Sequence, residues 1–251
     1  MSNVRTLVDG LPGAELFIYP FLETNFLQII QKGLAEETKK SMLRSALQGL
    51  AALHERNIIH TARDIKPNNI LVDYEEVDGR FSIKKVQIAD LEDSAILPPG
   101  RFLKGTLCGN QMWRSPESWA RSRQGFPSDV FSFGAVCIYV MLDDMALRPL
   151  EAELNASDSW RHILRLMVSF FGEDAGFKGL LRWIGEDNPF FERLIAIAGT
   201  FNEEKPQVPF GNWRYVDEKF RDLITKMTNL DPTRRITAVE ALEHPWLAQN
   251  D

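Results

Sequence analysis

Cysteine is scarce in this 251-residue chain, which contains only Cys108 and Cys137, and neither residue stands in a spacing typical of metal ligands. Two cysteines cannot form the disulfide framework on which small secreted domains depend. We therefore expect an intracellular protein, cytoplasmic or nuclear, that folds without disulfides.

Long hydrophobic runs are also missing. The most apolar stretch, residues 130–142, is interrupted by Ser132 and is too short to span a bilayer. The first residues contain no apolar segment of signal-peptide length. These absences predict no insertion into a membrane.

Positive charge is not in excess either. Lysine and arginine number 29 against 35 aspartate and glutamate, which gives a formal net charge of −6. Broad binding of nucleic acid or of anionic membranes needs a basic surface, so we expect neither partner. A hydrophobic fraction of 44% and a charged fraction of 25% are typical of a globular domain that buries a core.

Hydrophobic periodicity predicts the first elements. Residues 4–8 and 16–21 are short apolar runs separated by Asp9-Gly10-Leu11-Pro12-Gly13, a pattern typical of a hairpin. Residues 34–54 carry apolar side chains at helical spacing. Short strands are expected at 58–59 and 70–72, on either side of a polar loop. A further strand is expected at 83–89, after a polar insert over 73–80.

Helices are predicted for much of the remaining chain. A helix capped by Ser128 and running to about Leu142 is apolar on nearly all sides, so it should lie in the middle of the core. Residues 160–171 and 190–198 are amphipathic, and the segment 143–215 that contains them carries no recognisable motif. Thr237-Ala238-Val239-Glu240 fits a capping box at the start of a late helix.

Three polar clusters could carry chemistry. They are Asp64-Ile65-Lys66-Pro67-Asn68-Asn69, Asp90-Leu91-Glu92 and Ser115-Pro116-Glu117. Phosphoryl transfer needs a carboxylate near the attacking hydroxyl, a cation on the moving phosphate and hard oxygen ligands for Mg²⁺. The first two clusters contain these groups, although each polar residue could also be an ordinary loop or turn residue.

The clusters and their order resemble the motifs of eukaryotic protein kinases. Residues 63–69 are similar to the catalytic loop H-R-D-L-x-x-x-N, Asp90-Leu91-Glu92 resembles D-F-G, and Ser115-Pro116-Glu117 resembles A-P-E. Residues 109–114 look like the segment that precedes A-P-E and docks the substrate. Residues 129–134 and 231–237 are similar to the D-V-W-S-x-G and D-P-x-x-R motifs of the same family.

The resemblance implies a protein-kinase-like α+β fold. Most of the chain would be the mainly α-helical C-lobe with small β-hairpins, over residues 25–248. Residues 1–24 would be a remnant of the N-lobe, namely a strand hairpin and the hinge. The tryptophans and histidines would then be packing or capping groups rather than ligands.

The resemblance also implies roles for single residues. Asp64 would be the catalytic aspartate, Lys66 would contact the transferred phosphate, and Asn69 and Asp90 would hold Mg²⁺. The cofactors would be ATP and Mg²⁺, and Lys66-Pro67 is similar to the form of the loop that is specific for serine and threonine. The partner would be a protein substrate or a regulatory protein.

Further residues would support the site. Arg63 would bind a phosphate on the activation segment, for which Thr106 is a candidate acceptor. Glu117 and Arg235 would form an ion pair that anchors this segment. Asp129 would brace the catalytic loop from below.

Some positions depart from the family pattern. Thr61 and Ala62 separate His60 from the arginine, Glu92 stands where D-F-G has glycine, and Asn110 stands where threonine is usual. No G-x-G-x-x-G and no V-A-I-K-like lysine occurs in the 251 residues. Without the rest of the N-lobe, we expect an exposed apolar face beneath the hairpin.

Three hypotheses follow from these matches and departures. The chain is a truncated product or incomplete gene model of a serine/threonine kinase; or it is a pseudokinase that acts as a binding or scaffold module; or it is the C-lobe of a split kinase that another chain completes.

Overall fold

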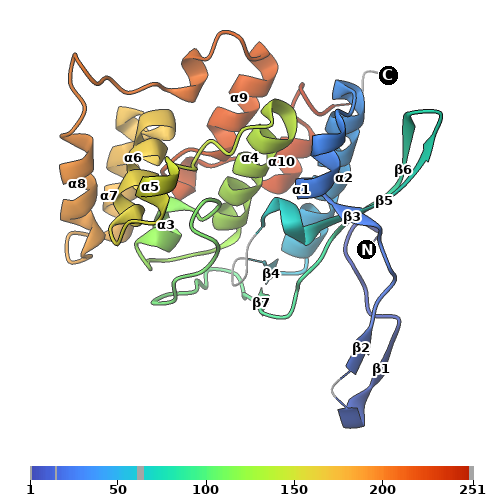
Figure 1. Ribbon diagram of the computed structural model, residues 1–251. Coiled ribbons are helices and arrows are strands. Elements are labelled where there is room, and N and C mark those ends of the chain that lie inside the picture. Colours follow the sequence, from blue (N-terminus) through green and yellow to red (C-terminus); the bar gives the residue numbers. More distant parts are fainter. Residues whose placement is uncertain (1, 15, 61–64, 249–251) are drawn as a thin grey trace.

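The computed structural model describes residues 2–14, 16–60 and 65–248. Figure 1 shows a body of helices with a small sheet at one end, from which a two-stranded hairpin projects. Arg63 and Asp64 lie outside the described residues.

The described helices have the following bounds: α1 (Phe26–Ile29), α2 (Glu36–His54), α3 (Pro116–Trp119), α4 (Phe126–Leu142), α5 (Glu151–Leu154), α6 (Ser159–Phe171), α7 (Asp174–Ile184), α8 (Phe190–Ala198), α9 (Glu218–Met227) and α10 (Ala238–Leu242). The described strands are β1 (Asp9–Leu11), β2 (Leu16–Ile18), β3 (Thr24–Asn25), β4 (Ile58–Ile59), β5 (Ile70–Val77), β6 (Arg80–Ile88) and β7 (Ala95–Ile96). Three small antiparallel sheets result, β1-β2, β3-β5-β6 and β4-β7. The architecture is the protein-kinase-like α+β fold that the resemblance implies.

Helix α4 forms the centre of the core, as its apolar sequence predicts. Every residue from Ser128 to Val140 is buried, and α4 packs against α2 and α9. Gly134 permits the close approach of α9, because a Cβ atom at this position would lie 2.8 Å from the Thr228 side chain.

The predicted cap of α4 is wrong. The helix begins at Phe126 with Gly125 as its N-cap, so Ser128 lies inside the first turn. Pro127 explains the earlier start, because its fixed φ suits the first turn of a helix and its missing N–H costs nothing there. The Ser128 hydroxyl is therefore free to donate to Glu117 Oε1, at 2.6 Å.

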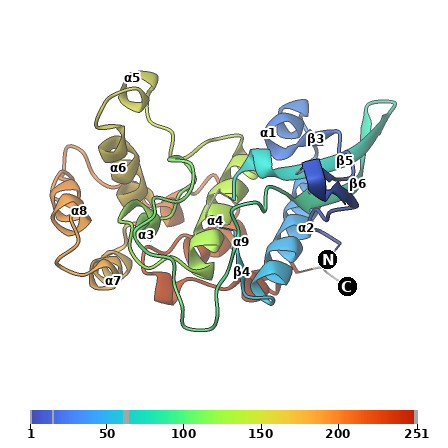
Figure 2. The same ribbon diagram turned by 90° about the horizontal axis from the view of Figure 1, so that it is seen from below.

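Helix α2 confirms the prediction of a helix over residues 34–54 within two residues. Glu36 and Glu37 lie in its first turn, where negative charge interacts favourably with the helix dipole. Its apolar face is buried against α4, α10 and β6. The helix therefore joins the small sheet to the helical body (Figure 2).

The N-terminal hairpin is confirmed, but the strand predicted over residues 4–8 is wrong. Residues 3–5 instead run parallel to the end of β6: Arg5 N donates to Ile88 O at 2.8 Å, and Ile88 N donates to Asn3 O at 2.9 Å. Val4 is buried by this contact. The hairpin strands begin only at Asp9, which pairs with Ile18.

The strand bounds predicted on either side of the polar insert 73–80 are also wrong, because β5 and β6 continue through it as a long hairpin. The two strands pair out to Val77 and Arg80, and Asp78 and Gly79 form the turn with φ of 51° and 71°. Asp-Gly with two positive φ angles is the preferred two-residue hairpin turn. Polarity here reflects solvent exposure of a hairpin rather than a loop.

The remaining helical predictions are confirmed. Residues 160–171 and 190–198 form α6 and α8, and Thr237 and Glu240 form the capping box of α10. Among the described residues, no helix combines the length and the apolar character needed to cross a membrane.

Candidate active site

A pocket of about 450 Å³ lies where the N-terminal segment meets the ends of β5 and β6. Its walls come from three separate parts of the chain, which only the fold brings together. The lining residues are Arg5, Leu7, Tyr19, Asn68, Asn69, Leu71, Ala89, Asp90, Leu91 and Glu92. The two residues predicted as metal ligands, Asn69 and Asp90, are therefore in one pocket.

Asn69 is held by backbone contacts on both sides. It ends a 3-10 turn, Pro67–Asn69, that Pro67 begins, and its N–H donates to Lys66 O at 3.0 Å. Its carbonyl accepts from Ala89 N at 2.8 Å, which ties the loop to the end of β6. This position brings its side chain to Asp90, and Asn69 Nδ2 donates to Asp90 Oδ2 at 3.1 Å.

The backbone of Asp90 is left-handed, with φ of 63°. Few residues other than glycine adopt this region, and aspartate is among those that tolerate it. In this motif Asp90 has a positive φ, whereas Glu92 does not. Glu92 therefore does not need the conformational freedom of the glycine that the D-F-G motif has at this position.

The donor set of the pocket fits Mg²⁺. This ion prefers hard oxygen ligands, and proteins usually supply one or two carboxylates while the phosphates of the nucleotide supply the rest. Asp90 offers a carboxylate, and the Asn69 side chain carries an amide oxygen next to the Nδ2 atom that donates to Asp90. The described residues contain no group of three or more His, Cys, Asp or Glu side chains suited to a metal.

Lys66 is half-buried at the start of the 3-10 turn, in an extended conformation. The buried side chain of Ile65 anchors the chain just before it. Asp64, the predicted catalytic aspartate, and Arg63 lie outside the described residues, so their roles stay predictions. Thr106 is exposed, and its proposed phosphate contact with Arg63 is likewise untested.

Asp129 holds the chain just before the catalytic loop, and its predicted support of residues 63 and 64 lies outside the described residues. Asp129 is buried in the first turn of α4, and its Oδ2 accepts from His60 N at 2.9 Å and lies 3.0 Å from His54 Nε2. The His60 ring is buried and contacts Ala89 O at 2.9 Å. The chain entering the catalytic loop is therefore fixed between α4 and the end of β6.

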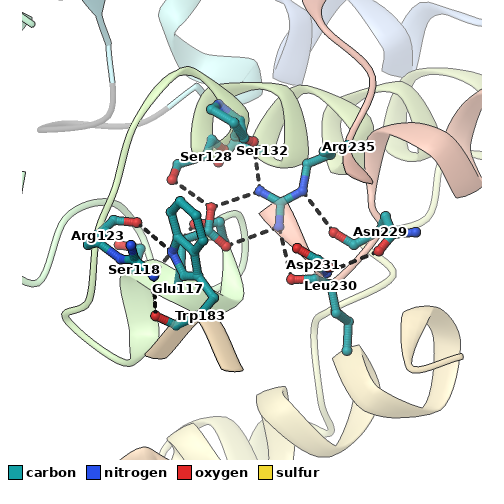
Figure 3. A network of polar contacts seen from close by, with 12 residues as sticks. Glu117, Ser118, Arg123, Ser128, Ser132, Trp183, Asn229, Leu230, Asp231 and Arg235 are labelled. Atoms are coloured by element: carbon teal, nitrogen blue, oxygen red, sulfur yellow. Dashed lines mark hydrogen bonds and ion pairs between the residues drawn. The ribbon is translucent and has the colours of Figure 1, made fainter. Parts of the chain in front are cut away.

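The predicted Glu117–Arg235 ion pair is confirmed (Figure 3). Arg235 Nη1 and Nη2 lie 2.7 Å and 3.0 Å from the two carboxylate oxygens of Glu117, a two-pronged geometry, and both side chains are buried. Arg235 also donates to Pro127 O and Asn229 O. The pair therefore joins the end of the activation segment to the start of α4 and to the segment before α10.

Arg5 and Tyr19 line the pocket but were not predicted to be near it. The Arg5 guanidinium lies 4.9 Å from the centroid of the Tyr19 ring and donates to Pro20 O at 3.0 Å. No sequence motif marks either residue. Their position depends on the parallel contact of residues 3–5 with β6, which is a tertiary interaction.

Comparison with known proteins supports the resemblance. A family model described as the protein kinase domain matches residues 16–247. The calcium/calmodulin-dependent protein kinase cmkB of Emericella nidulans is 25% identical over 98% of this chain and 48% of its own length. The CaM kinase-like vesicle-associated protein of Homo sapiens is 25% identical over 99% of this chain and 42% of its own length.

A third relative, the calcium/calmodulin-dependent protein kinase type 1 of Macrobrachium nipponense, is 23% identical over 99% of this chain and 55% of its own length. The chain thus spans about half the length of the curated relatives it matches. Because the family model covers nearly all of the chain, in the order of motifs described above, the chain belongs to the protein kinase family.

Proposed function

We propose that this chain is the catalytic lobe of a protein kinase that uses Mg-ATP to phosphorylate serine or threonine hydroxyls of proteins. The observation that carries the proposal is the contact between Asn69 and Asp90, at 3.1 Å in a pocket of about 450 Å³. These residues stand 21 positions apart, and both match metal-binding positions of the family motifs. When bound, Mg-ATP supplies the phosphoryl group and shields its charge.

The residues of the chain would have the following roles in phosphoryl transfer. Asp90 and Asn69 would orient the metal-bound phosphates, and Lys66 would contact the phosphate that is transferred. Asp64 would accept the proton of the attacking hydroxyl. Lys66-Pro67 favours serine and threonine acceptors, and the partner is then a protein substrate or a regulatory protein.

A second candidate function is binding without transfer, as in a pseudokinase or scaffold module. Glu92 favours it, because its carboxylate lines the same pocket two residues from Asp90. An additional negative charge there opposes the binding of nucleotide phosphates. The exposed apolar hairpin β1-β2 favours the split kinase, in which another chain supplies a lobe that completes the pocket.

Titration calorimetry with ATP, with and without Mg²⁺, tests the proposal. Asp90→Asn removes the carboxylate, and Asp78→Asn is its matched control, since both aspartates have positive φ and asparagine suits both. Asp78 lies in the β5-β6 turn and does not line the pocket. We expect Mg²⁺-dependent binding that Asp90→Asn weakens about tenfold or more, and that Asp78→Asn leaves unchanged.

A transfer assay then separates the two candidate functions. The wild-type chain and Asp64→Asn are compared for transfer of labelled phosphate to a mixture of serine- and threonine-rich proteins. Nucleotide binding with transfer that Asp64→Asn abolishes supports the kinase. Binding without transfer, or no binding at millimolar nucleotide, contradicts it and supports the binding module.

A further inference from the structure

Helices α6 and α8 lie at the end of the molecule away from the β1-β2 hairpin (Figure 1). A second pocket, of about 560 Å³, is lined by residues of these helices and of the chain around α3. It is formed by the chain on either side of α3 and by the first residues of α6 and α8. Its apolar walls include Leu107, Trp119, Trp160 and Phe190. Nothing in the proposed transfer chemistry uses these residues.

The charge of this pocket is of one sign. Among the lining residues that the structure describes, Arg121 and Arg193 are charged and none is acidic. The acidic chain neighbours Asp158 and Asp187 are not among the lining residues. The pocket is therefore a positive site on a chain whose net charge is −6. It attracts anions locally although the net charge of the chain is negative.

Neither arginine is neutralised by a carboxylate of the described part of the chain. Among the residues that the structure describes, no carboxylate forms an ion pair with Arg121 or Arg193. The Arg193 guanidinium instead lies over two aromatic rings, 5.0 Å from the centroid of Trp160 and 4.9 Å from that of Phe190. Stacking of this kind orients the planar group and leaves its N–H donors available at the edge.

We propose that this pocket binds an acidic peptide segment of a partner protein, with a bulky apolar side chain flanked by aspartate or glutamate. The guanidinium groups match carboxylates, which they bind through paired N–H donors. The aromatic and aliphatic walls match an apolar side chain, which gains free energy when it is buried. The pocket volume has room for a side chain or two, so the occupant is a short segment of chain.

Fluorescence anisotropy with labelled peptides tests this binding in the absence of nucleotide and Mg²⁺, so the result does not depend on phosphoryl transfer. The probe is a short peptide with a central phenylalanine flanked by glutamates. A second peptide carries lysines in place of the glutamates, and a third carries phosphoserines. We expect the glutamate peptide to bind most tightly, with an affinity that falls as salt is raised.

Variants of the chain locate the site. Arg121→Asn removes one charge with a residue that tolerates the φ of 50° at this position, and Arg193→Gln removes the other. Each is expected to weaken binding of the glutamate peptide about tenfold, which corresponds to about 1.4 kcal/mol. Arg161→Gln is the control, because Arg161 is exposed on α6 but does not line the pocket.

The outcomes are distinct. Loss of binding in Arg121→Asn and Arg193→Gln, with Arg161→Gln unchanged and all variants melting as the wild type does, supports the proposal. Absence of binding, equal binding of the lysine peptide, equal loss in Arg161→Gln, or binding of the phosphoserine peptide alone overturns it.

Discussion

At the scale of single residues, the Glu117–Arg235 pair places two charges in the interior, where water cannot solvate them. Each charge is stabilised by the other and by hydrogen bonds from Ser128 and to Pro127 O, Asn229 O and Leu230 O. Removal of one partner therefore lowers the free energy of unfolding by more than the intact pair contributes to it, because the remaining charge is left buried alone.

Arg235→Met tests this argument. We expect the free energy of unfolding, measured by urea denaturation, to fall by about 3 to 5 kcal/mol, since the Glu117 carboxylate loses its partner. Lys178→Ala is the control, because Lys178 and Asp174 form an exposed pair at 2.7 Å, and its effect should stay below about 1 kcal/mol. Equal effects of the two substitutions would contradict the buried pair as a structural anchor.

Asp222 gives the protein a pH dependence in acid. Hydrogen bonds from Lys226, and to a smaller extent from His244, lower the pKa of the Asp222 carboxyl below its usual value of 3.8. A carboxyl with a lowered folded-state pKa stabilises the fold above its unfolded-state value, and this contribution disappears as pH falls through the folded-state pKa. The loss should therefore occur below about pH 4.

Asp222→Asn should make stability less dependent on pH in that range. The effect is modest, because the Asp222 side chain is 53% exposed and solvent screens its partners. Urea midpoints measured for wild type, Asp222→Asn and the exposed control Glu203→Gln check this expectation. An acid-side loss that is the same in Asp222→Asn and wild type would show that another carboxyl dominates.

At the scale of elements, α2 illustrates how a local preference is reversed by packing. Gly49 lies inside this helix, where alanine would ordinarily be more favourable by about 1 kcal/mol. A Cβ atom at position 49 would, however, lie 2.4 Å from Asn3 O, the carbonyl that accepts from Ile88 N. The glycine allows the N-terminal segment to lie between α2 and β6.

Gly49→Ala should therefore destabilise the protein, by about 1 to 3 kcal/mol, because backbone atoms have to move. Gln48→Ala, on the exposed face of the same helix, should stay within about 0.5 kcal/mol of wild type. Thermal and urea unfolding of both variants measure this difference. A Gly49→Ala variant more stable than wild type would show that residues 3–5 do not pack as described.

Motif spacing predicted the polar elements better than it predicted the strand boundaries. The Thr237–Glu240 capping box depends on contacts within one turn, so its sequence was sufficient. The strand expected at residues 4–8 failed because the end of β6 pairs with residues 3–5, a partner more than 80 positions away in the chain. Such pairing leaves no local pattern to read.

At the scale of the whole molecule, the β1-β2 hairpin carries many exposed apolar side chains. Phe17 and Phe21 are 62% and 83% exposed, and Leu7, Val8, Leu11, Leu16 and Ile18 are exposed beside them. The hairpin extends from the body in Figure 1, and these seven exposed apolar side chains lie on its strands or within three residues of them. Exposed apolar side chains gathered on one short segment favour association.

Phe17→Ser combined with Phe21→Ser should reduce self-association, which light scattering as a function of protein concentration measures. The free energy of unfolding should change by no more than about 0.5 kcal/mol, because exposed side chains contribute little to the core. Leu150→Ser and Tyr215→Ser form the control, since these residues are 75% and 77% exposed away from the hairpin. Scattering that falls equally in both double variants would show that the hairpin has no special role in self-association.

The sequence by itself determined the family, the central apolar helix and the residues Asn69, Asp90, Glu117, Asp129 and Arg235 as members of a shared framework. These depend on residue type and on spacing along the chain. Only the tertiary structure decided that Asn69 and Asp90 share a pocket with Arg5 and Tyr19, and that Arg121 and Arg193 share another. Long-range packing brings such residues together, because the buried surface of the whole chain, and not any local pattern, fixes which segments meet.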